Sequence, residues 1–162
     1  MSDLLTKIPL TYEPLRKNRW MLRFPADLGI QEWTLQEARR PKINQSDTKI
    51  EFLNTETYVV GRYTWETITV KLRDPIGPST SQAVMEWVRL TSESVTGRQG
   101  YAIGYKRDVE LEMLDPTGAV VQKWILKNCF ITSADFGNLS YSEDGLADVE
   151  ITLRPDYCIL AY

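Results

Sequence analysis

Three glycines close together are the first residues whose spacing suggests chemistry. Gly97, Gly100 and Gly104 form the glycine-rich segment GRQGYAIGY. A phosphate-binding loop needs a Gly-Lys-Ser/Thr sequence and opens a helix, but this segment lacks that sequence and follows a predicted helix. We therefore expect these glycines to shape the backbone and not to bind phosphate.

Acidic pairs are the second candidate for chemistry. Glu143-Asp144 and the pair Asp148/Glu150 have the residue types of a glycosidase acid and base. Asp148 and Glu150 are also i, i+2 neighbours on the polar side of a predicted strand, where solvated carboxylates are ordinary. We interpret them as surface carboxylates, with catalysis as the alternative.

The remaining reactive residue types exclude further kinds of catalytic and metal site. The chain contains no histidine, which excludes Ser-His-Asp and Cys-His catalysis and histidine-ligated zinc. Cys129 and Cys158 have neither metal-ligand spacing nor a CxxC arrangement, so we expect two reduced, partly buried thiols. Arg39-Arg40 with Lys42 is a small basic patch that we interpret as solvated or salt-bridged. The sequence therefore predicts no catalytic residue, no metal site, no cofactor and no enzyme activity.

Bulk composition indicates a protein that binds or assembles. The chain of 162 residues has 43% hydrophobic and 25% charged residues, which predicts one globular domain over residues 1–162. Its net charge is −3, and acidic and basic residues are mixed along it, so nothing indicates tight nucleic-acid binding. The N-terminus lacks the features of a secretion signal, and no apolar run approaches a membrane span, so we expect no membrane insertion.

Alternation of apolar and polar residues predicts a mostly β fold. In 65–73, for example, Ile68, Val70 and Leu72 share one face of a strand while Thr67 and Thr69 share the other. Strands with one apolar and one polar face predict antiparallel sheets that expose one face to solvent. The tetrapeptide 115–118, DPTG, predicts a tight turn that joins two of them into a hairpin over 109–131. Strands are predicted at 19–25, 31–38, 65–73, 106–114, 119–132 and 146–154.

A single helix is predicted between two of these strands. Ser79 is a good N-cap, Gln82 completes a capping-box pattern, and Gly97 is the predicted C-cap. An apolar stripe at helical spacing predicts that the helix covers a sheet. The stripe comprises Val84, Trp87, Val88, Thr91 and Val95.

Two segments lie outside this regular pattern. Residues 1–18 have no clear period and predict an irregular N-terminal arm. Residues 42–64 are polar, with two short β-like runs at 50–53 and 58–60, a turn candidate at Asn54 and a break at Gly61. A long excursion in a small domain is usually an interaction element, and a mobile surface hairpin is the alternative.

The order of these features resembles the tail tube proteins of contractile-tailed bacteriophages. It is similar, more distantly, to the haemolysin-coregulated protein of type VI secretion. The resemblance covers roughly residues 15–160 and is one of overall layout. The features that carry it are Asn18-Arg19-Trp20-Met21-Leu22, Pro41 before the excursion, Trp65-Glu66-Thr67-Ile68-Thr69-Val70, Asp74, Met85-Glu86-Trp87, the hairpin 109–131, Phe136-Gly137-Asn138-Leu139 and Leu153-Arg154-Pro155-Asp156-Tyr157.

The resemblance implies a fold and a mechanical function. The implied fold has two packed antiparallel sheets curled into a partial β-barrel or sandwich, with one helix alongside. Copies of the chain would form hexameric rings that stack into a hollow tube, with the sheet of 109–131 continuing into neighbouring subunits. The implied partners are a tail sheath, a baseplate and a tape-measure protein. The tube would be part of a virion assembled in the host cytoplasm, and DNA would pass through it without specific binding.

The resemblance also assigns roles to individual residues. The excursion would reach a neighbouring subunit and the next ring, burying Ile50, Phe52, Tyr58 and Val59 only on assembly. Polar strand faces would line the channel, and their carboxylates would repel DNA. The candidate channel-wall residues are Thr67, Thr69, Glu110, Glu112, Asp148 and Glu150.

Three alternatives remain open on the sequence. The first keeps the fold: a baseplate or tube-initiating paralogue, or the tube of a phage-like or type VI injection system. The second is a ligand-binding β-barrel that works as a monomer around an apolar interior pocket. The third is an enzyme built on an acidic pair.

Overall fold

The computed structural model describes residues 7–162, and its secondary structure is mostly β. The strands of this part of the chain are β1 (Trp20–Arg23), β2 (Leu35–Ala38), β3 (Ile43–Phe52), β4 (Thr55–Trp65), β5 (Ile68–Arg73), β6 (Arg107–Leu114), β7 (Val120–Asp135), β8 (Asp148–Arg154) and β9 (Tyr157–Leu160). Its helices are the 3-10 turns η1 (Ala26–Leu28) and η2 (Glu32–Thr34) and the α-helices α2 (Thr80–Thr91) and α3 (Ala102–Tyr105).

The long strand β7 joins the two layers of the body. Its first half pairs with β6 and β9, and β1 pairs with the far edge of β6; we call these four strands sheet I. Its second half pairs with β8, which is followed by β5 and β2; we call these sheet II. Between the two halves, Asn128 has a left-handed φ of 54°, and its N–H donates to Asp108 Oδ1 at 3.0 Å. This kink lets one strand serve both sheets, because a local left-handed residue redirects the strand.

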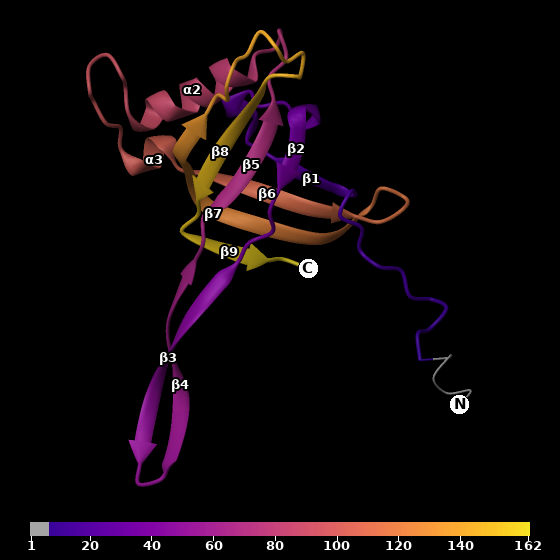
Figure 1. The fold of residues 1–162 in the computed structure, drawn as a ribbon, viewed down its shortest axis with the longest axis vertical. Helices are drawn as coiled ribbons and strands as arrows, with labels where there is room; N and C mark the ends of the chain where they lie inside the picture. The colour runs from indigo at the N-terminus through magenta and orange to yellow at the C-terminus, as the bar shows by residue number, and fades with distance from the viewer. Residues whose placement is uncertain (1–6) are drawn as a thin grey trace.

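Both sheets are antiparallel, and the barrel is not closed, as the sequence predicted. β1 and β2 are the outer strands of the path β1-β6-β7-β8-β5-β2 and do not pair with each other. Figure 1 shows the two layers crossing, with β5 and β8 running steeply and β6 and β7 running across. Apolar residues of the two layers meet between them and form a core with very little exposed surface. Sheet I contributes Leu22, Val109, Leu111 and Leu126, and sheet II contributes Ile68, Val70, Leu72, Val149, Ile151 and Leu153.

Helix α2 closes one end of this core. Val84 and Trp87 are buried, and the Trp87 ring packs edge-on against Phe24 with centroids 6.2 Å apart. Trp87 Nε1 also donates to the carbonyl of Tyr105 at 2.8 Å, so the buried indole is satisfied. At the start of the helix, Ser79 Oγ accepts from the Gln82 N–H at 3.3 Å, which confirms the predicted N-cap.

The end of the helix differs from the prediction. α2 stops at Thr91, because Ser92 is extended and bridges to Gln99. Val95 lies beyond the helix and is 90% exposed, so its place in the apolar stripe was wrong. Gly97 has a left-handed φ of 69°, but it closes the turn after the helix by donating to the carbonyl of Glu93 at 2.9 Å.

Three other elements were mispredicted. The segment 31–38 is a strand only from Leu35, because the 3-10 turn η2 comes first and leaves Trp33 60% exposed. The short helix α3 was not predicted, so the described part of the chain has a second α-helix besides the expected one. β9 was also missed, although it pairs with β7 along its whole length.

The β6–β7 hairpin and its turn agree with the sequence. The Gly118 N–H donates to the carbonyl of Asp115 at 3.1 Å, and Gly118 has a φ of 90°. The Asp115 carboxylate accepts from the Thr117 N–H, the Thr117 hydroxyl and the Ala119 N–H at 2.7–2.9 Å. These bonds, chiefly that from the Thr117 hydroxyl, hold the pKa of Asp115 below its ordinary value.

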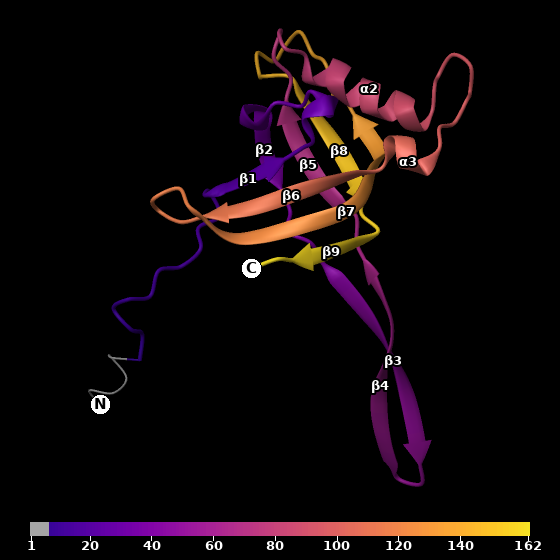
Figure 2. The same ribbon diagram turned by 180° about the vertical axis from the view of Figure 1, so that it is seen from behind.

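The two irregular segments leave the body in different ways. Residues 7–18 of the predicted N-terminal arm form no helix or strand and extend away from sheet I; residues 1–6 of the arm lie outside the described part. Strands β3 and β4 form a long hairpin that projects from the body in both views (Figures 1 and 2). Within residues 7–162, no helix has the length and apolar character needed to cross a membrane.

Candidate assembly surfaces

The β3–β4 hairpin is exposed over nearly its whole length. Every residue from Ile43 to Thr64 is exposed. The predicted assembly residues Ile50, Phe52, Tyr58 and Val59 are 49%, 72%, 59% and 46% exposed. The register shows that they do not share one face, because the side chains of a strand alternate.

One face of the hairpin is uncharged along its outer half. Phe52 pairs with Thr55, Ile50 with Thr57, and Thr48 with Val59. Three of the four predicted residues therefore lie together, flanked by threonines. At the tip, Leu53 is 88% exposed and has a left-handed φ of 53°, a conformation that leucine rarely adopts. Sequence reasoning missed Leu53 and the threonines as part of this surface, which we call the uncharged hairpin face (Thr48, Ile50, Phe52, Leu53, Thr55, Thr57 and Val59).

The opposite face of the hairpin is charged. Lys49 Nζ lies 2.7 Å from Glu51 Oε1 and 2.5 Å from Glu56 Oε2. The two carboxylates, Glu51 first, raise the pKa of Lys49 above its ordinary value. Tyr58 lies on this side, directly opposite Lys49. Tyr58 therefore faces away from the other three residues, and its burial on assembly stays a prediction.

The base of the hairpin is tied to the body. Trp65 packs edge-on against Trp124 of β7 with centroids 6.5 Å apart, and its carbonyl accepts from Arg154 Nη1 at 3.3 Å. Asn44 Nδ2 donates to Glu66 Oε1 at 2.7 Å, which is the main reason that the pKa of Glu66 lies below its ordinary value. The hairpin therefore has a fixed root and a free outer half.

Gly61 lies inside β4 and is not the strand break that the sequence suggested. The register shifts opposite it, between Gln45 and Asp47. A Cβ on Gly61 would collide with Ser46 Oγ, whose hydroxyl donates to the carbonyl of Arg62 at 3.0 Å. Gly61 thus allows a bulge that bends the hairpin, as glycine commonly does within strands.

Four of the six predicted channel residues share the outer face of sheet II. Thr69 lies opposite Thr152 there, Glu150 lies opposite Lys71, and Thr67 precedes β5 in the same alternation. Asp148 pairs with Lys71, with Oδ2 and Nζ 3.3 Å apart. The side chains of this face are mostly polar and carry charges of both signs: Asp148 lies opposite Arg73, and Glu150 lies opposite Lys71. Sequence reasoning missed its further members Glu37, Ser133 and Asp135, which only the strand pairing brings to this face.

The other two predicted channel residues lie on the outer face of sheet I. Because the core separates the sheets, this face points away from the outer face of sheet II. Glu110 Oε2 lies 3.2 Å from Lys123 Nζ. Glu112 is only 4% exposed, and its Oε2 lies 3.1 Å from Arg23 Nε. Glu112 is therefore shielded from water in this conformation, and its place in a channel wall stays a prediction.

Three strands of the body keep one free edge within residues 7–162. β1 pairs only with β6, β2 only with β5, and β9 only with β7. A free edge presents unpaired N–H and C=O groups, so each can accept a strand from another chain. β9 adds half-exposed Ile159 and Leu160 beside its edge.

The structure gives the glycine-rich segment a structural role. Gly100 lies so close to the end of α2 that a Cβ would collide with the carbonyl oxygen of Leu90, and its N–H donates to the carbonyl of Thr91 at 3.0 Å. Gly104 belongs to α3. The segment is a tight return after α2 and presents no phosphate cradle.

The two cysteines of the chain lie in the interior of the body. Cys129 and Cys158 are free and buried; burial raises the pKa of Cys158 to about 11 and that of Cys129 further. Among residues 7–162, no cluster of three or more His, Cys, Asp or Glu side chains could hold a metal ion.

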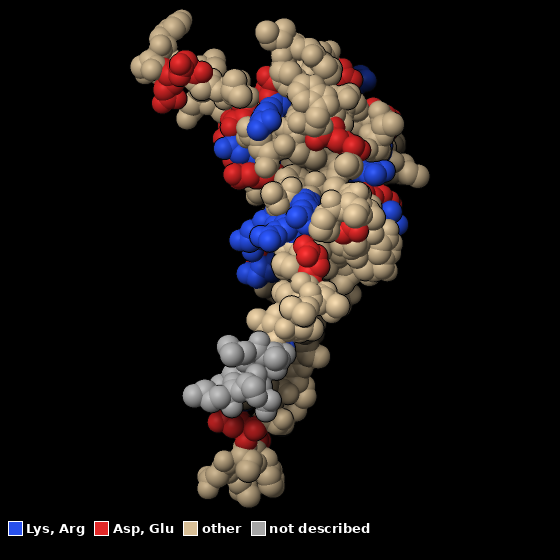
Figure 3. Space-filling view, turned by 90° about the vertical axis from the view of Figure 1, so that its right-hand side faces the viewer, with Lys and Arg blue, Asp and Glu red and all other residues tan. Residues whose placement is uncertain are grey.

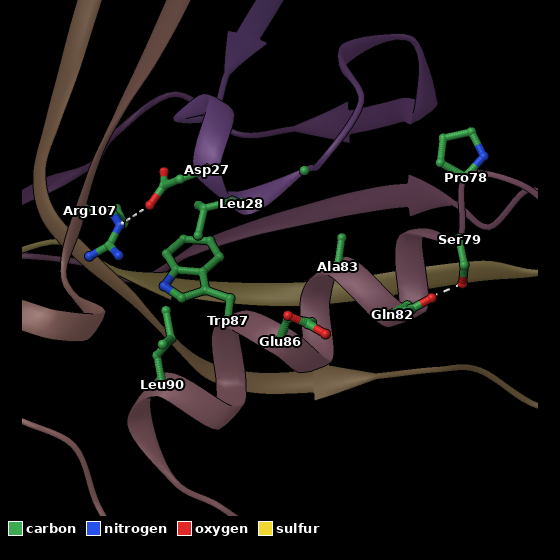
Figure 4. Close-up of a pocket in the computed structure, with 11 residues that line it drawn as sticks. Asp27, Leu28, Pro78, Ser79, Gln82, Ala83, Glu86, Trp87, Leu90 and Arg107 are labelled. Carbon is green, nitrogen blue, oxygen red and sulfur yellow. Dashed lines mark hydrogen bonds and ion pairs between the residues drawn. The ribbon is translucent and has the colours of Figure 1, made fainter.

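The described residues 7–162 pack tightly between the two sheets, and a groove lies outside this core. The space between the sheets is filled by core side chains such as Val70, Val109 and Ile151, all fully buried. A groove of about 550 Å³ lies outside this core, between η1 and α2. It is lined by Leu28 and Trp87 and flanked by an Asp27–Arg107 ion pair of 3.1 Å (Figure 4). The groove is lined by polar and apolar side chains together.

The sequence matches no protein-family model and no curated protein, but it shares its fold with solved structures, of which three illustrate the similarity. A chain in the cryo-EM structure of the anti-feeding prophage cap, the tube-terminating cap, aligns with TM-score 0.73 and 19% identity over 99% of this chain and 98% of that one. A chain in the sheath–tube complex of the extracellular contractile injection system PVC, in the extended state, aligns with TM-score 0.72 and 17% identity over 96% and 95%.

Hcp1 from Flavobacterium johnsoniae aligns less closely, with TM-score 0.54 and 8% identity over 88% of this chain and 94% of that one. The chain therefore has the fold found in tube and cap components of contractile injection systems and, at lower similarity, in Hcp1. This confirms the fold that the sequence resemblance implied.

Proposed function

We propose that this chain is a structural protein that polymerises as stacked hexameric rings into the inner tube of a contractile phage tail or a phage-like injection particle. The shared fold supports a tube-type role, because the structures that share it are a tube-terminating cap and a sheath–tube complex. Its work is mechanical, and no bond chemistry or cofactor is needed.

The β3–β4 hairpin is the observation that carries this proposal. A two-stranded hairpin is marginally stable alone in water, and this one has no buried residue from Ile43 to Thr64. It nevertheless exposes Ile50, Phe52 and Leu53 at its outer end. Exposed apolar groups on a protruding element are typical of a contact with another molecule. The uncharged hairpin face would be buried against a neighbouring subunit and the next ring.

Ring closure would use the free strand edges. The β1 edge of sheet I and the β9 edge lie on opposite sides of the same sheet. If β9 of one copy meets β1 of the next, sheet I, with the β6–β7 hairpin in it, continues around the ring. Such a head-to-tail contact repeats identically until the ring closes, and it pairs the free edges of β1 and β9.

The channel wall would be the outer face of sheet II. It contains four of the predicted residues, Thr67, Thr69, Asp148 and Glu150, and its hydroxyl and carboxylate groups keep water between wall and cargo. Each subunit has a net charge of −3, so a ring of copies would repel DNA, which would slide through without binding. Glu110 would lie elsewhere on the subunit surface.

The proposed partners follow from the proposed role. A sheath would surround the tube, a baseplate would start it, and a tape-measure protein would set its length. The tube would belong to a virion or particle assembled in the host cytoplasm.

A second candidate function is a tube terminator or initiator. The cap structure favours it, since its TM-score of 0.73 is as high as that of the sheath–tube chain at 0.72. A terminator would form single rings that do not stack, whereas a tube protein would form long tubes.

Electron microscopy of the purified chain, with light scattering on the same sample, tests the proposal. Hollow tubes of uniform diameter are expected. Isolated rings would favour the terminator, and a monomer at the highest soluble concentration would contradict assembly.

A further inference from the structure

The loop 136–147 is an apolar, acidic surface at the end of the body opposite the hairpin (Figure 1). It contains no helix or strand, and all its residues are exposed. Leu139, Tyr141 and Leu146 are 93%, 111% and 81% exposed. The loop carries Glu143 and Asp144 and no Lys or Arg. A structureless loop of this length with three bare apolar side chains is unusual unless something covers it.

A basic cleft lies on the hairpin side of the body. It has a volume of about 300 Å³ and opens where β1 and β2 fail to close the barrel. Its rim carries Arg16, Lys17, Arg39 and Arg40, and its floor includes Trp20. Figure 3 shows Lys and Arg side chains gathered on one area below the upper part of the body. Arg40 is three residues from the start of β3, which places the cleft at the root of the hairpin.

The charges on the two surfaces have few partners within the subunit; Arg40 Nη1 donates to the neutral Gln122 Oε1 at 3.4 Å. Within residues 7–162, none of the four rim cations forms an ion pair, although most other Lys and Arg side chains of the body do. In the same range, Glu143 and Asp144 also form none. Four unpaired cations around a partly apolar floor and two unpaired acids among apolar side chains are complementary in both charge and hydrophobicity.

We propose that loop 136–147 of one copy docks into the basic cleft of the copy in the next ring. This inference rests on the proposed tube function and names a further part of its stacking contact. The two surfaces lie at opposite ends of the subunit, so the contact is heterologous and repeats along a filament. The hairpin root and the cleft face the same ring, and Tyr141 and Leu146 meet the apolar floor while Glu143 and Asp144 meet the rim.

Opposite charge reversals on the two surfaces test the contact. One variant replaces the four rim cations with Glu, and the other carries Glu143→Lys and Asp144→Lys. Each alone is expected to raise the critical concentration for assembly by about tenfold or more, since like or missing charges oppose docking. A 1:1 mixture of the two is expected to assemble, because each loop then finds a cleft of opposite sign.

The matched control is Glu86→Lys/Glu93→Lys, which changes two exposed acids of the α2 region and has the same net charge as the loop variant. Because it keeps the loop and the cleft intact, it is expected to assemble alone at the wild-type critical concentration. A rise in its critical concentration as large as that of the loop variant, or unchanged assembly of the cleft variant alone, overturns the inference. Wild-type protein that forms no tubes refutes the proposed function instead, so the two failures are distinguishable.

A disulfide trap gives a second readout that does not depend on charge. Arg40→Cys combined with Asp144→Cys is expected to give a ladder of linked copies after mild oxidation of assembled tubes, while each single variant gives none. Native Cys129 and Cys158 are buried and do not interfere. Only monomers after oxidation of well-formed tubes contradict the contact.

Discussion

Truncation of Phe52 at the tip of the hairpin should weaken assembly without affecting the fold of the subunit. Phe52 is 72% exposed in the single chain, so most of its surface remains to be buried in a contact. Complete burial of such a side chain is worth about 1.5–3 kcal/mol, and truncation to Ala should lose about 1–2 kcal/mol of that per subunit. At about 1.4 kcal/mol per factor of ten, the critical concentration of Phe52→Ala should rise about five- to thirty-fold.

Phe52→Asp should have the stronger effect. A carboxylate forced into an apolar contact adds a desolvation cost of several kcal/mol, so tubes should not form over the range where wild type assembles. The free subunit should keep its unfolding free energy within about 0.5 kcal/mol, because the position is exposed. Pelleting gives the critical concentration, and thermal unfolding of the unassembled protein checks the fold.

Val60→Asp is the matched control for the hairpin. Val60 is 66% exposed and lies on the charged side of the hairpin, opposite Asp47. The control should assemble nearly as wild type does. Normal tubes from Phe52→Asp at the wild-type critical concentration would refute the assignment of the uncharged hairpin face.

Three further predictions concern the body. Gly100→Ala should lower the unfolding free energy by about 1–3 kcal/mol in denaturant titration, because its Cβ collides with backbone, whereas Gly104→Ala has open space and should change little. Cys129 and Cys158 should resist iodoacetamide at pH 8 in the folded chain and react in denaturant. Their pKa values are raised by burial, so stability should fall as pH rises from about 9, where unfolded thiols ionise, towards about 11, where Cys158 ionises in the fold. Asp115→Ala should lower Tm at neutral pH, and the difference should shrink as pH falls below 3.8, because a carboxylate with a lowered pKa stabilises only while ionised.

The strands of the body could be predicted because their pattern is local. Ile68, Val70 and Leu72 alternate with polar residues, and all three are nearly or fully buried. The helix N-cap at Ser79 and the turn that ends at Gly118 were equally predictable from the sequence, since each depends on a few neighbouring residues.

Elements fixed by distant contacts were not predictable in the same way. β9 is too short to show a period and exists because β7 offers it an edge. The alternation around Trp33 imitated a strand, but a 3-10 turn directs the buried Thr34 inward, where its hydroxyl donates to the carbonyl of Gln31 at 2.6 Å. α2 ends early because Ser92 pairs with Gln99 across a turn.

The assembly surfaces were predictable as segments and not as faces. The length of 42–64 pointed to an interaction element, yet only the strand register shows that Tyr58 faces away from Phe52. Glu112 looked like its neighbour Glu110 in the sequence, but its burial depends on Arg23, which belongs to a strand far away in the chain. Pairing between distant segments decides which way Tyr58 faces and whether Glu112 is buried. The alternation of residues along one strand does not show this pairing.

The most direct test of the proposed tube is electron microscopy of the purified chain with averaging along the particles. The proposal predicts hollow tubes of uniform diameter built from stacked six-subunit rings, with the hairpin of each subunit seated on its neighbours. A chain that stays a monodisperse monomer at its highest soluble concentration, with its fold intact, would contradict the proposal.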